Sequence, residues 1–163
     1  MTSLPDFIDT AARLHGDTCA LRFGGKSWSY SELREAVGRA AVHLSNDRRA
    51  GRTGILSANR AGVVIAAHAC ARAGAAFVPH GSRFTADELA WQVTAAGVTT
   101  LVYDEPRTDL ALDLASKLDL RLIPMSEIEE PAPEPVNTTR TPLIDLDREA
   151  AILFTSGTTG RPK

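Results

Sequence analysis

The last stretch of the sequence reads Ala150-Ala151-Ile152-Leu153-Phe154-Thr155-Ser156-Gly157-Thr158-Thr159-Gly160-Arg161-Pro162-Lys163. It begins with an apolar run, which predicts a short buried strand. The chain then changes to small hydroxyl-bearing residues and glycines, which allow backbone N–H groups to approach an anion closely. Lys163 adds a positive charge suited to a phosphate oxygen. The stretch is therefore typical of a strand that leads into a phosphate-binding loop.

The predicted phosphate ligands are hydroxyl, backbone N–H and ammonium groups. They belong to Thr155, Ser156, Gly157, Thr158, Thr159, Gly160 and Lys163. The loop is not a Walker A loop, which requires G-x-x-x-x-G-K-[ST], because Gly160 is followed by Arg-Pro-Lys. A flexible Ser/Thr/Gly tail has the same composition, so composition alone leaves both interpretations open. The preceding apolar run and the Pro-Lys ending favour the loop.

Composition and charge narrow the class of protein. The 163 residues suggest one domain, and 44% hydrophobic with 23% charged residues is ordinary for a globular protein. The net charge of −2 and the absence of a basic run argue against a nucleic-acid partner. No apolar run approaches the roughly 18 residues of a membrane span, and the start does not resemble a signal peptide. Cys19 and Cys70 stand alone, which predicts free thiols in a reducing cytoplasm.

Hydrophobic periodicity predicts an α/β fold with a mainly parallel sheet and βαβ units. Strands are predicted at 19–23, 26–28, 54–57, 75–78, 99–103 and 120–123, with Pro79 and Pro124 ending two of them. Helices are predicted near 5–14, from Ser29 through Leu44, between Asn59 and Gly74, from Thr85 to about Ala96, and near 108–118. The first helix is expected to carry Phe7, Ala11 and Leu14 on one face.

Several single residues have a predicted local role. Ser29 with Glu32, and Thr85 with Glu88, have the spacing of capping boxes. Asn59 is a candidate N-cap, and Gly74 has the residue type expected just beyond a helix end. Trp91 is expected to pack against a neighbour rather than to bind a ligand. His80, a lone histidine after a strand, is interpreted as structural or exposed, with a functional site as the alternative.

Changes in composition divide the chain into three parts. Residues 1–130 are predicted to form an N-terminal α/β subdomain, 131–149 a proline-rich linker, and 150–163 the strand with its phosphate loop. The prolines of the linker region lie among acidic and polar residues, which favours an extended conformation. Because a phosphate loop is normally followed by a supporting helix or strand, we expect the chain to be part of a longer protein.

Three motifs and one further run carry a resemblance to a known family. Thr155–Lys163 resembles the phosphate-binding signature of the adenylate-forming superfamily, which includes acyl-CoA synthetases, luciferases and the adenylation domains of peptide synthetases. Trp28–Leu33 and Ala71–Pro79 resemble two earlier motifs of that superfamily, in the same order. Ser82–Gln92 is similar to 2-succinylbenzoate–CoA ligases. His80-Gly81 departs from the pattern, where an apolar residue followed by Asn or Asp is usual.

The resemblance implies an ATP-dependent ligase that activates a carboxylate. This chain would be the N-terminal part of the AMP-binding domain of that ligase. The loop would hold the β- and γ-phosphates of Mg²⁺-bound ATP while a small carboxylic acid attacks the α-phosphate, and coenzyme A would then displace AMP. In the family, the magnesium-binding glutamate, the adenine contacts and the catalytic lysine lie further along. We therefore expect no catalytic residue or metal ligand here, and no turnover by the chain alone. The alternatives are a non-catalytic remnant that binds a nucleotide or a partner, and an unrelated α/β module with a flexible tail.

Overall fold

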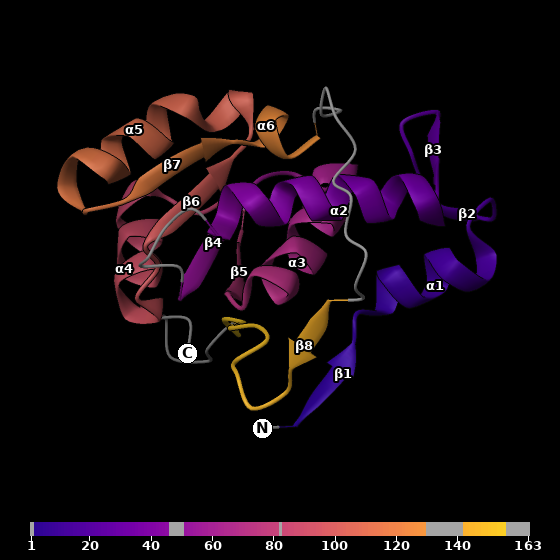
Figure 1. Cartoon of the computed structure of the whole chain (residues 1–163). Helices are drawn as coiled ribbons and strands as arrows, with labels where there is room; N and C mark the ends of the chain where they lie inside the picture. Colours follow the sequence, from indigo (N-terminus) through magenta and orange to yellow (C-terminus); the bar gives the residue numbers. More distant parts are fainter. Residues whose placement is uncertain (1, 46–50, 82, 130–141, 156–163) are drawn as a thin grey trace.

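The computed structural model describes residues 2–45, 51–81, 83–129 and 142–155 (Figure 1). The strands are β1 (Ser3–Pro5), β2 (Cys19–Phe23), β3 (Lys26–Ser29), β4 (Arg52–Leu56), β5 (Ala76–His80), β6 (Thr100–Tyr103), β7 (Arg121–Pro124) and β8 (Leu143–Asp145). The α-helices are α1 (Phe7–His15), α2 (Tyr30–Ser45), α3 (Ala61–Ala73), α4 (Ala86–Ala96), α5 (Thr108–Lys117) and α6 (Met125–Glu129), and a 3-10 turn, η1 (Glu105–Arg107), precedes α5.

The centre of the fold is a parallel sheet with the strand order β5-β4-β6-β7. The chain places β5 on one side of β4 and then β6 and β7 on the other side, so the direction of strand addition reverses at β4. Helices α2, α3 and α6 pack on one face of the sheet, and α4 and α5 pack on the other. The architecture is therefore three-layered, and it confirms the predicted α/β class with βαβ units.

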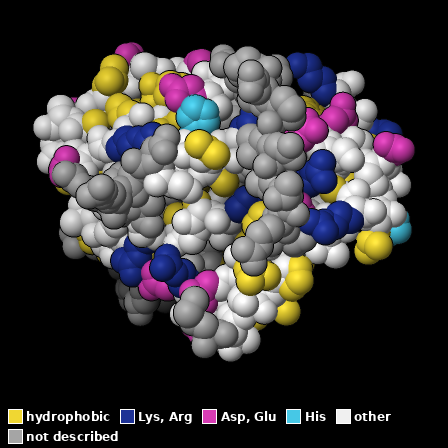
Figure 2. All heavy atoms as spheres, viewed as in Figure 1, with side chains coloured by type: hydrophobic (Ala, Val, Ile, Leu, Met, Phe, Trp, Pro, Cys, Tyr) yellow, Lys and Arg dark blue, Asp and Glu magenta, His cyan; other side chains and the backbone are white. Residues whose placement is uncertain are grey.

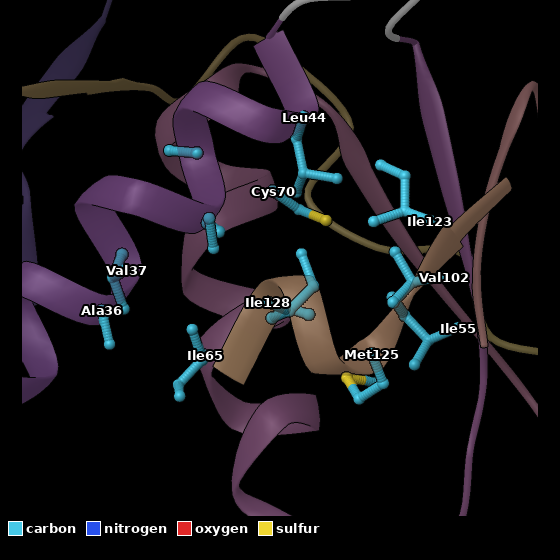
Figure 3. Close-up of a cluster of buried hydrophobic side chains, with 14 of the residues drawn as sticks. Ala36, Val37, Leu44, Ile55, Ile65, Cys70, Val102, Ile123, Met125 and Ile128 are labelled. Carbon is cyan, nitrogen blue, oxygen red and sulfur yellow. The ribbon is translucent and has the colours of Figure 1, made fainter. Parts of the chain in front are cut away.

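The larger core lies between the sheet and helices α2, α3 and α6 (Figure 3). Ile55, Val102 and Ile123 extend from three neighbouring strands and are at most 2% exposed. Side chains from all three helices meet them, among them Leu44, Ile65, Cys70, Met125 and Ile128. Burial of each such side chain stabilises the fold by about 1.5–3 kcal/mol. Burial also raises the pKa of the Cys70 thiol to about 12, so Cys70 is a core residue rather than a reactive one.

The opposite face of the sheet has a smaller core. Successive residues of a strand face opposite sides, so Leu56, next to Ile55, points towards α4 and α5. There it packs with Leu101, Leu89 and Leu114, all at most 1% exposed. Because both faces are covered, β4 and β6 have apolar residues on both sides, as is usual for parallel sheets.

Two antiparallel ribbons lie outside the sheet. β2 and β3 form the predicted hairpin around Gly24 and Gly25, whose φ angles of 56° and 79° suit residues without a Cβ. β1 pairs with β8 in an antiparallel register that places Leu4 opposite Ile144. The ribbon therefore joins a segment near the start of the chain to one far along it. This second ribbon was not predicted, since its strands are short and far apart in sequence. β8 falls within the predicted linker, of which residues 131–141 lie outside the described ranges.

Most of the predicted helix ends are confirmed. The backbone N–H of Ser29 donates to the Glu32 carboxylate at 2.7 Å, and that of Glu32 donates to Ser29 Oγ at 3.2 Å. The same reciprocal pair joins Thr85 and Glu88 at the start of α4. Gly74 ends α3 with a φ of 71°, in the left-handed region that favours glycine.

The prediction that Asn59 is the N-cap of α3 is wrong. α3 begins after Arg60, whose side chain makes no capping hydrogen bond. Instead the Glu129 carboxylate, at the end of α6, accepts a hydrogen bond of 2.8 Å from the backbone N–H of Gly62 and another of 2.9 Å from Arg60 Nε. An anionic oxygen from a distant helix therefore satisfies a donor that a local cap would otherwise satisfy.

Two other expectations need correction. Pro79 lies inside β5, which continues to His80, whereas Pro124 is the last residue of β7, as predicted. Both strands are at the sides of the sheet, where a missing N–H costs least. α1 buries Ile8 and Ala12, whereas Phe7 is 61% exposed, so the predicted apolar face of this helix points away from the core.

Candidate functional site

The segment that leads to the predicted phosphate loop follows the free edge of β5. The backbone N–H of Phe77 donates to the carbonyl of Ala150, and the N–H of Ile152 donates to the carbonyl of Phe77, each at 3.0 Å. Ala151 forms a single parallel bridge with Phe77, and the segment is not a regular strand. The predicted buried strand is therefore corrected to one bridged residue within an extended segment beside β5.

The side chains of this segment alternate between the protein and solvent. Ile152 and Phe154 pack against a cluster that includes Val78 of β5 and Val93 of α4. Leu153, between them, is 66% exposed. Extended backbone produces this alternation without a second hydrogen-bonded ladder. One side of the segment is thus fixed to the α4 face of the sheet.

Phe154 lies against two aromatic rings. Its centroid is 6.4 Å from that of His80 in a stacked arrangement with an interplanar angle of 27°. It is 5.8 Å from the Trp91 ring in a tilted arrangement of 59°. Both separations are within the range of favourable aromatic pairs. The expectation that Trp91 packs against a neighbour is confirmed.

His80 is buried at the carboxyl end of β5, with 5% of the residue exposed. Its Nδ1 is 3.0 Å from Gln92 Oε1 on α4, so Nδ1 carries the proton in this pair. Its Nε2 lies over Gly54, where a Cβ would come within 2.9 Å of it. Burial lowers the pKa of His80, and the hydrogen bond to Gln92 opposes that shift only in part. The ring is therefore neutral near pH 7 and held on two sides.

Charged side chains hold the residues just before this segment. Arg52 Nε and one terminal nitrogen of the same guanidinium donate to the two carboxylate oxygens of Glu149 at 2.9 and 3.0 Å, respectively. The other terminal nitrogen of Arg52 donates to the carbonyl of Ala96, at the end of α4, at 2.7 Å. Arg148 donates to the carbonyl of Gly74 at 3.0 Å. Sheet, α3 and α4 are thus all linked to the residues that precede the predicted loop.

A cavity of about 510 Å³ opens at the carboxyl ends of β4 and β5. It is lined by Ser57, Ala58, Asn59, His80, Gly81, Arg83 and Phe84. Ligands of open α/β sheets bind at the carboxyl ends of the strands, next to the point where strand order reverses. In this sheet that point is β4, so the cavity has the position expected for a ligand site.

Asp104, at the end of β6, holds one wall of this region in place. Its carboxylate accepts hydrogen bonds from Ser57 Oγ at 3.1 Å and from the backbone N–H of Ala58 at 2.9 Å. Arg107 donates to both carboxylate oxygens at 2.7 and 2.9 Å. Burial alone would raise the pKa of Asp104, but these donors outweigh it and lower the pKa below the usual value. The carboxylate is therefore ionised and fixes the loop after β4.

Of the predicted phosphate ligands, only Thr155 is within the described residues. It is exposed, and it follows Phe154 directly. Ser156, Gly157, Thr158, Thr159, Gly160 and Lys163 lie outside the described ranges, so their role remains a prediction. In the ranges that are described, no three His, Cys, Asp or Glu side chains come together as a candidate metal site.

The surface carries charges of both signs. On the face in Figure 2, basic and acidic side chains are interspersed, and hydrophobic ones gather over the β1–β8 ribbon. Leu4 and Leu143 in this ribbon are 42% and 64% exposed. None of the helices in the described part of the chain combines the length and apolar composition needed to cross a membrane.

Comparison with known proteins places this chain in a family. The model of the AMP-binding enzyme family matches residues 8–163, and the chain belongs to that family. It is 30% identical, over 154 residues, to a feruloyl-CoA synthase from an Amycolatopsis species. It is also 30% identical, over 166 residues, to a 2-succinylbenzoate–CoA ligase from Geobacillus sp. strain WCH70. These alignments cover 93% and 99% of the chain.

Solved structures show the same relationship. The o-succinylbenzoate–CoA synthetase from Bacillus subtilis, in complex with its acyl-adenylate intermediate, aligns with a TM-score of 0.82 and 26% identity over 99% of the chain. The same enzyme has been solved with ATP and a magnesium ion. The chain spans 42% of that solved protein and about a third of the curated relatives, at 30% and 32%. It corresponds to the N-terminal part of the adenylate-forming fold.

The sequence did not predict the contacts that hold the approach segment, residues 150–155, which leads to the predicted phosphate loop. Arg52, Glu149 and Arg148 are ordinary surface residues in the sequence, and no local pattern pairs them. The His80 contact had a usable signal, because Gln92 falls on the buried stripe of α4 beside Leu89, Val93 and Ala96. A buried amide requires a partner. The position of Gln92 on this stripe therefore indicates that an element packed against α4 supplies a polar partner.

Proposed function

We propose that this chain forms the N-terminal, ATP-phosphate-binding part of an ATP-dependent carboxylate-activating ligase. The observation that carries the proposal is the family match over residues 8–163, which includes Thr155 to Lys163. The described structure supports it, because Ala150, Ile152 and Phe154 attach the chain to β5 and its neighbours immediately before the predicted loop. A loop that holds phosphates needs such a fixed starting point.

The reaction has two steps. A carboxylate oxygen of the acid attacks the α-phosphorus of ATP, a P–O bond forms, and pyrophosphate leaves to give an acyl-adenylate. The thiolate of coenzyme A then attacks the acyl carbon and AMP leaves, which gives the thioester. Thr155, Ser156, Thr158 and Thr159, with the backbones of Gly157 and Gly160, would donate hydrogen bonds to phosphate oxygens. Lys163 would offset the charge that develops on the leaving pyrophosphate.

The partners of the complete protein follow from the relatives. A feruloyl-CoA synthase and 2-succinylbenzoate–CoA ligases use aromatic carboxylic acids, as their names state. We assign a small carboxylic acid and coenzyme A to this protein on that basis. Mg²⁺ would arrive with ATP, and we assign it no ligand among the described residues. The free thiols of Cys19 and Cys70 support a cytoplasmic location.

The complete reading frame that encodes this chain provides the test. The purified product should catalyse ATP–pyrophosphate exchange that depends on an added carboxylic acid, with ferulate and 2-succinylbenzoate as the first acids to try. The 163-residue chain alone should show no exchange, since the family's catalytic lysine lies outside it. A complete product that binds Mg-ATP but shows no exchange with a broad panel of acids would favour the alternative, a nucleotide- or partner-binding remnant. Exchange by the 163-residue chain would contradict its predicted inactivity.

A further inference from the structure

We propose that residues 2–15 and 142–149 form a separate cooperative unit, which the ion pair between Asp6 and Arg72 fastens to the C-terminal end of α3. We call these two stretches the ribbon unit, because they contain α1 and the β1–β8 ribbon. In Figure 1 the ribbon lies away from the parallel sheet. The inference concerns a conformational device of the described fold, so it does not depend on the proposed function.

Asp6 connects three parts of the fold. Arg72 Nε donates to one oxygen of the Asp6 carboxylate at 3.0 Å, and a terminal nitrogen of the same guanidinium lies 3.0 Å from the other oxygen. That second oxygen also accepts a hydrogen bond of 2.8 Å from the backbone N–H of Asp9, which caps α1. The backbone N–H of Asp6 donates to the carbonyl of Pro142, beside β8, at 2.9 Å. One residue therefore links the ribbon, α1 and α3.

The ion pair is buried, which makes it costly to break. The side chains of Arg72 and Asp6 are 9% and 4% exposed. Burial alone would raise the pKa of Asp6, but the Arg72 guanidinium and the backbone N–H of Asp9 outweigh it and lower the pKa. The carboxylate is therefore ionised. Removing one partner of such a pair leaves the other charge buried and unpaired, and this is strongly destabilising.

The second strand of the ribbon is attached to the same end of α3. Arg148, three residues beyond β8, donates to the carbonyl of Gly74, which directly follows α3, at 3.0 Å. A positively charged group is favourable at the C-terminal end of a helix. The two stretches are also joined to each other, because the backbone N–H of Leu146 donates to the carbonyl of Thr2 at 2.9 Å. Both stretches thus share one anchor on the body of the protein.

The ribbon unit has few apolar contacts of its own. An isolated two-stranded ribbon is marginally stable in water, and Leu4 and Leu143 are 42% and 64% exposed. Within α1, the buried apolar side chains are Ile8 and Ala12. The central strands β4 and β6 are instead covered on both faces. Because regions with few buried contacts open before the core does, loss of the ion pair should open both stretches together and leave the sheet folded.

Hydrogen exchange, measured by mass spectrometry on the complete product of the reading frame, tests the proposal. Asp6→Asn keeps an oxygen that can cap α1 and removes the charge that faces Arg72. Exchange in residues 2–15 and in residues 142–149 should become about tenfold faster or more, while β4 and β6 stay within about twofold of the unchanged protein. Asp17→Asn makes the same chemical change at an exposed residue just after α1, and it should leave both stretches within about twofold.

A second pair of variants tests the ion pair itself. Asp6→Asn combined with Arg72→Met leaves no unpaired buried charge, so both stretches should exchange no faster than in Asp6→Asn alone. If Asp6→Asn does not fold, Arg72→Lys keeps the charge but loses the two-point contact, and it should speed exchange in the same two stretches by a smaller factor.

Three results would overturn the inference. Faster exchange confined to residues 2–15 would show that the two stretches do not open together. An equal increase in β4 and β6 would show that the pair holds the whole fold rather than one unit. Exchange in Asp6→Asn that matches Asp17→Asn would show that the ion pair fastens nothing.

Discussion

The guanidinium group of Arg52 binds the carboxylate of Glu149 through two hydrogen bonds of 2.9 and 3.0 Å, although the two residues are 97 positions apart. Arg52 begins β4, and Glu149 precedes the segment that leads to the predicted phosphate loop. The same guanidinium binds the carbonyl of Ala96 at the end of α4. One side chain therefore ties the sheet, a helix and the approach segment together.

Replacing Arg52 should cost more stability than replacing Glu149. Arg52→Ala removes both the pair and the partly buried hydrogen bond to Ala96, and we expect the free energy of unfolding to fall by about 1–2 kcal/mol. Glu149→Gln removes only the charge of an exposed partner and should cost about 0.5 kcal/mol or less. Urea unfolding of both variants checks this order. Equal losses would show that the Ala96 contact contributes nothing.

Asp104 should contribute to stability through its ionised form. Asp104→Ala leaves the N–H of Ala58 and the Arg107 side chain without this acceptor, and the expected cost is about 2–3 kcal/mol. Because the folded pKa of Asp104 is lowered, its contribution is present above the unfolded value of about 3.9 and is lost as the pH falls through the folded pKa. The measurement is urea unfolding at pH 7 and along a series down to pH 3.

The control for Asp104 is Asp109→Ala, an exposed aspartate in the first turn of α5. It should change the free energy of unfolding by less than about 0.5 kcal/mol. If the two variants lose equal stability, the hydrogen bonds of Asp104 are not the reason for its effect.

Because of His80, we expect the folded chain to lose stability on mild acidification. The unfolded state takes up a proton near the ordinary histidine pKa of about 6.5, whereas the folded state, with a lowered pKa, does so only at lower pH. Stability should therefore decline as the pH falls from about 6.5 towards the folded pKa. The groups around the ring, Gln92, Gly54 and Phe154, are uncharged, and Arg83 lines the same cavity.

The test is chemical denaturation of the unchanged chain and of His80→Leu between pH 7.5 and 5. His80→Leu leaves Gln92 without its partner and should be less stable at pH 7.5 by about 1–3 kcal/mol. Its stability should nevertheless decline less on acidification, with the remaining decline due in part to His68, whose pKa burial also lowers. Parallel pH profiles would show that His80 does not titrate differently on folding.

The parts of the fold that follow local rules could be predicted from the sequence. Both capping boxes, the glycine after α3 and the βαβ alternation depend on neighbouring residues, and the structure confirms them. The prediction that Pro79 stops its strand is wrong, because a proline is excluded from central strands but tolerated at the side of a sheet, and strand order is not visible in a local pattern.

Contacts between distant segments could not be predicted in the same way. The β1–β8 ribbon pairs residues about 140 positions apart, such as Leu4 with Ile144. The cap of α3 comes from Glu129, and the clamp on the approach segment comes from Arg52. Each of these depends on the completed fold rather than on spacing. The predicted loop itself, from Ser156 onward, lies outside the described residues and stays a prediction.

The measurement that tests the central claim most directly is the affinity of the 163-residue chain for Mg-ATP, compared with that of Thr158→Ala and Lys163→Ala. Charge-assisted hydrogen bonds to phosphate are strong, so each variant should bind about tenfold or more weakly than the unchanged chain. Thr10→Ala on the exposed side of α1 and Lys26→Ala on β3 are the matched controls and should bind as the unchanged chain does. Binding that is absent, or that is equally strong in Thr158→Ala and Lys163→Ala, would contradict the assignment of this segment as the ATP phosphate loop.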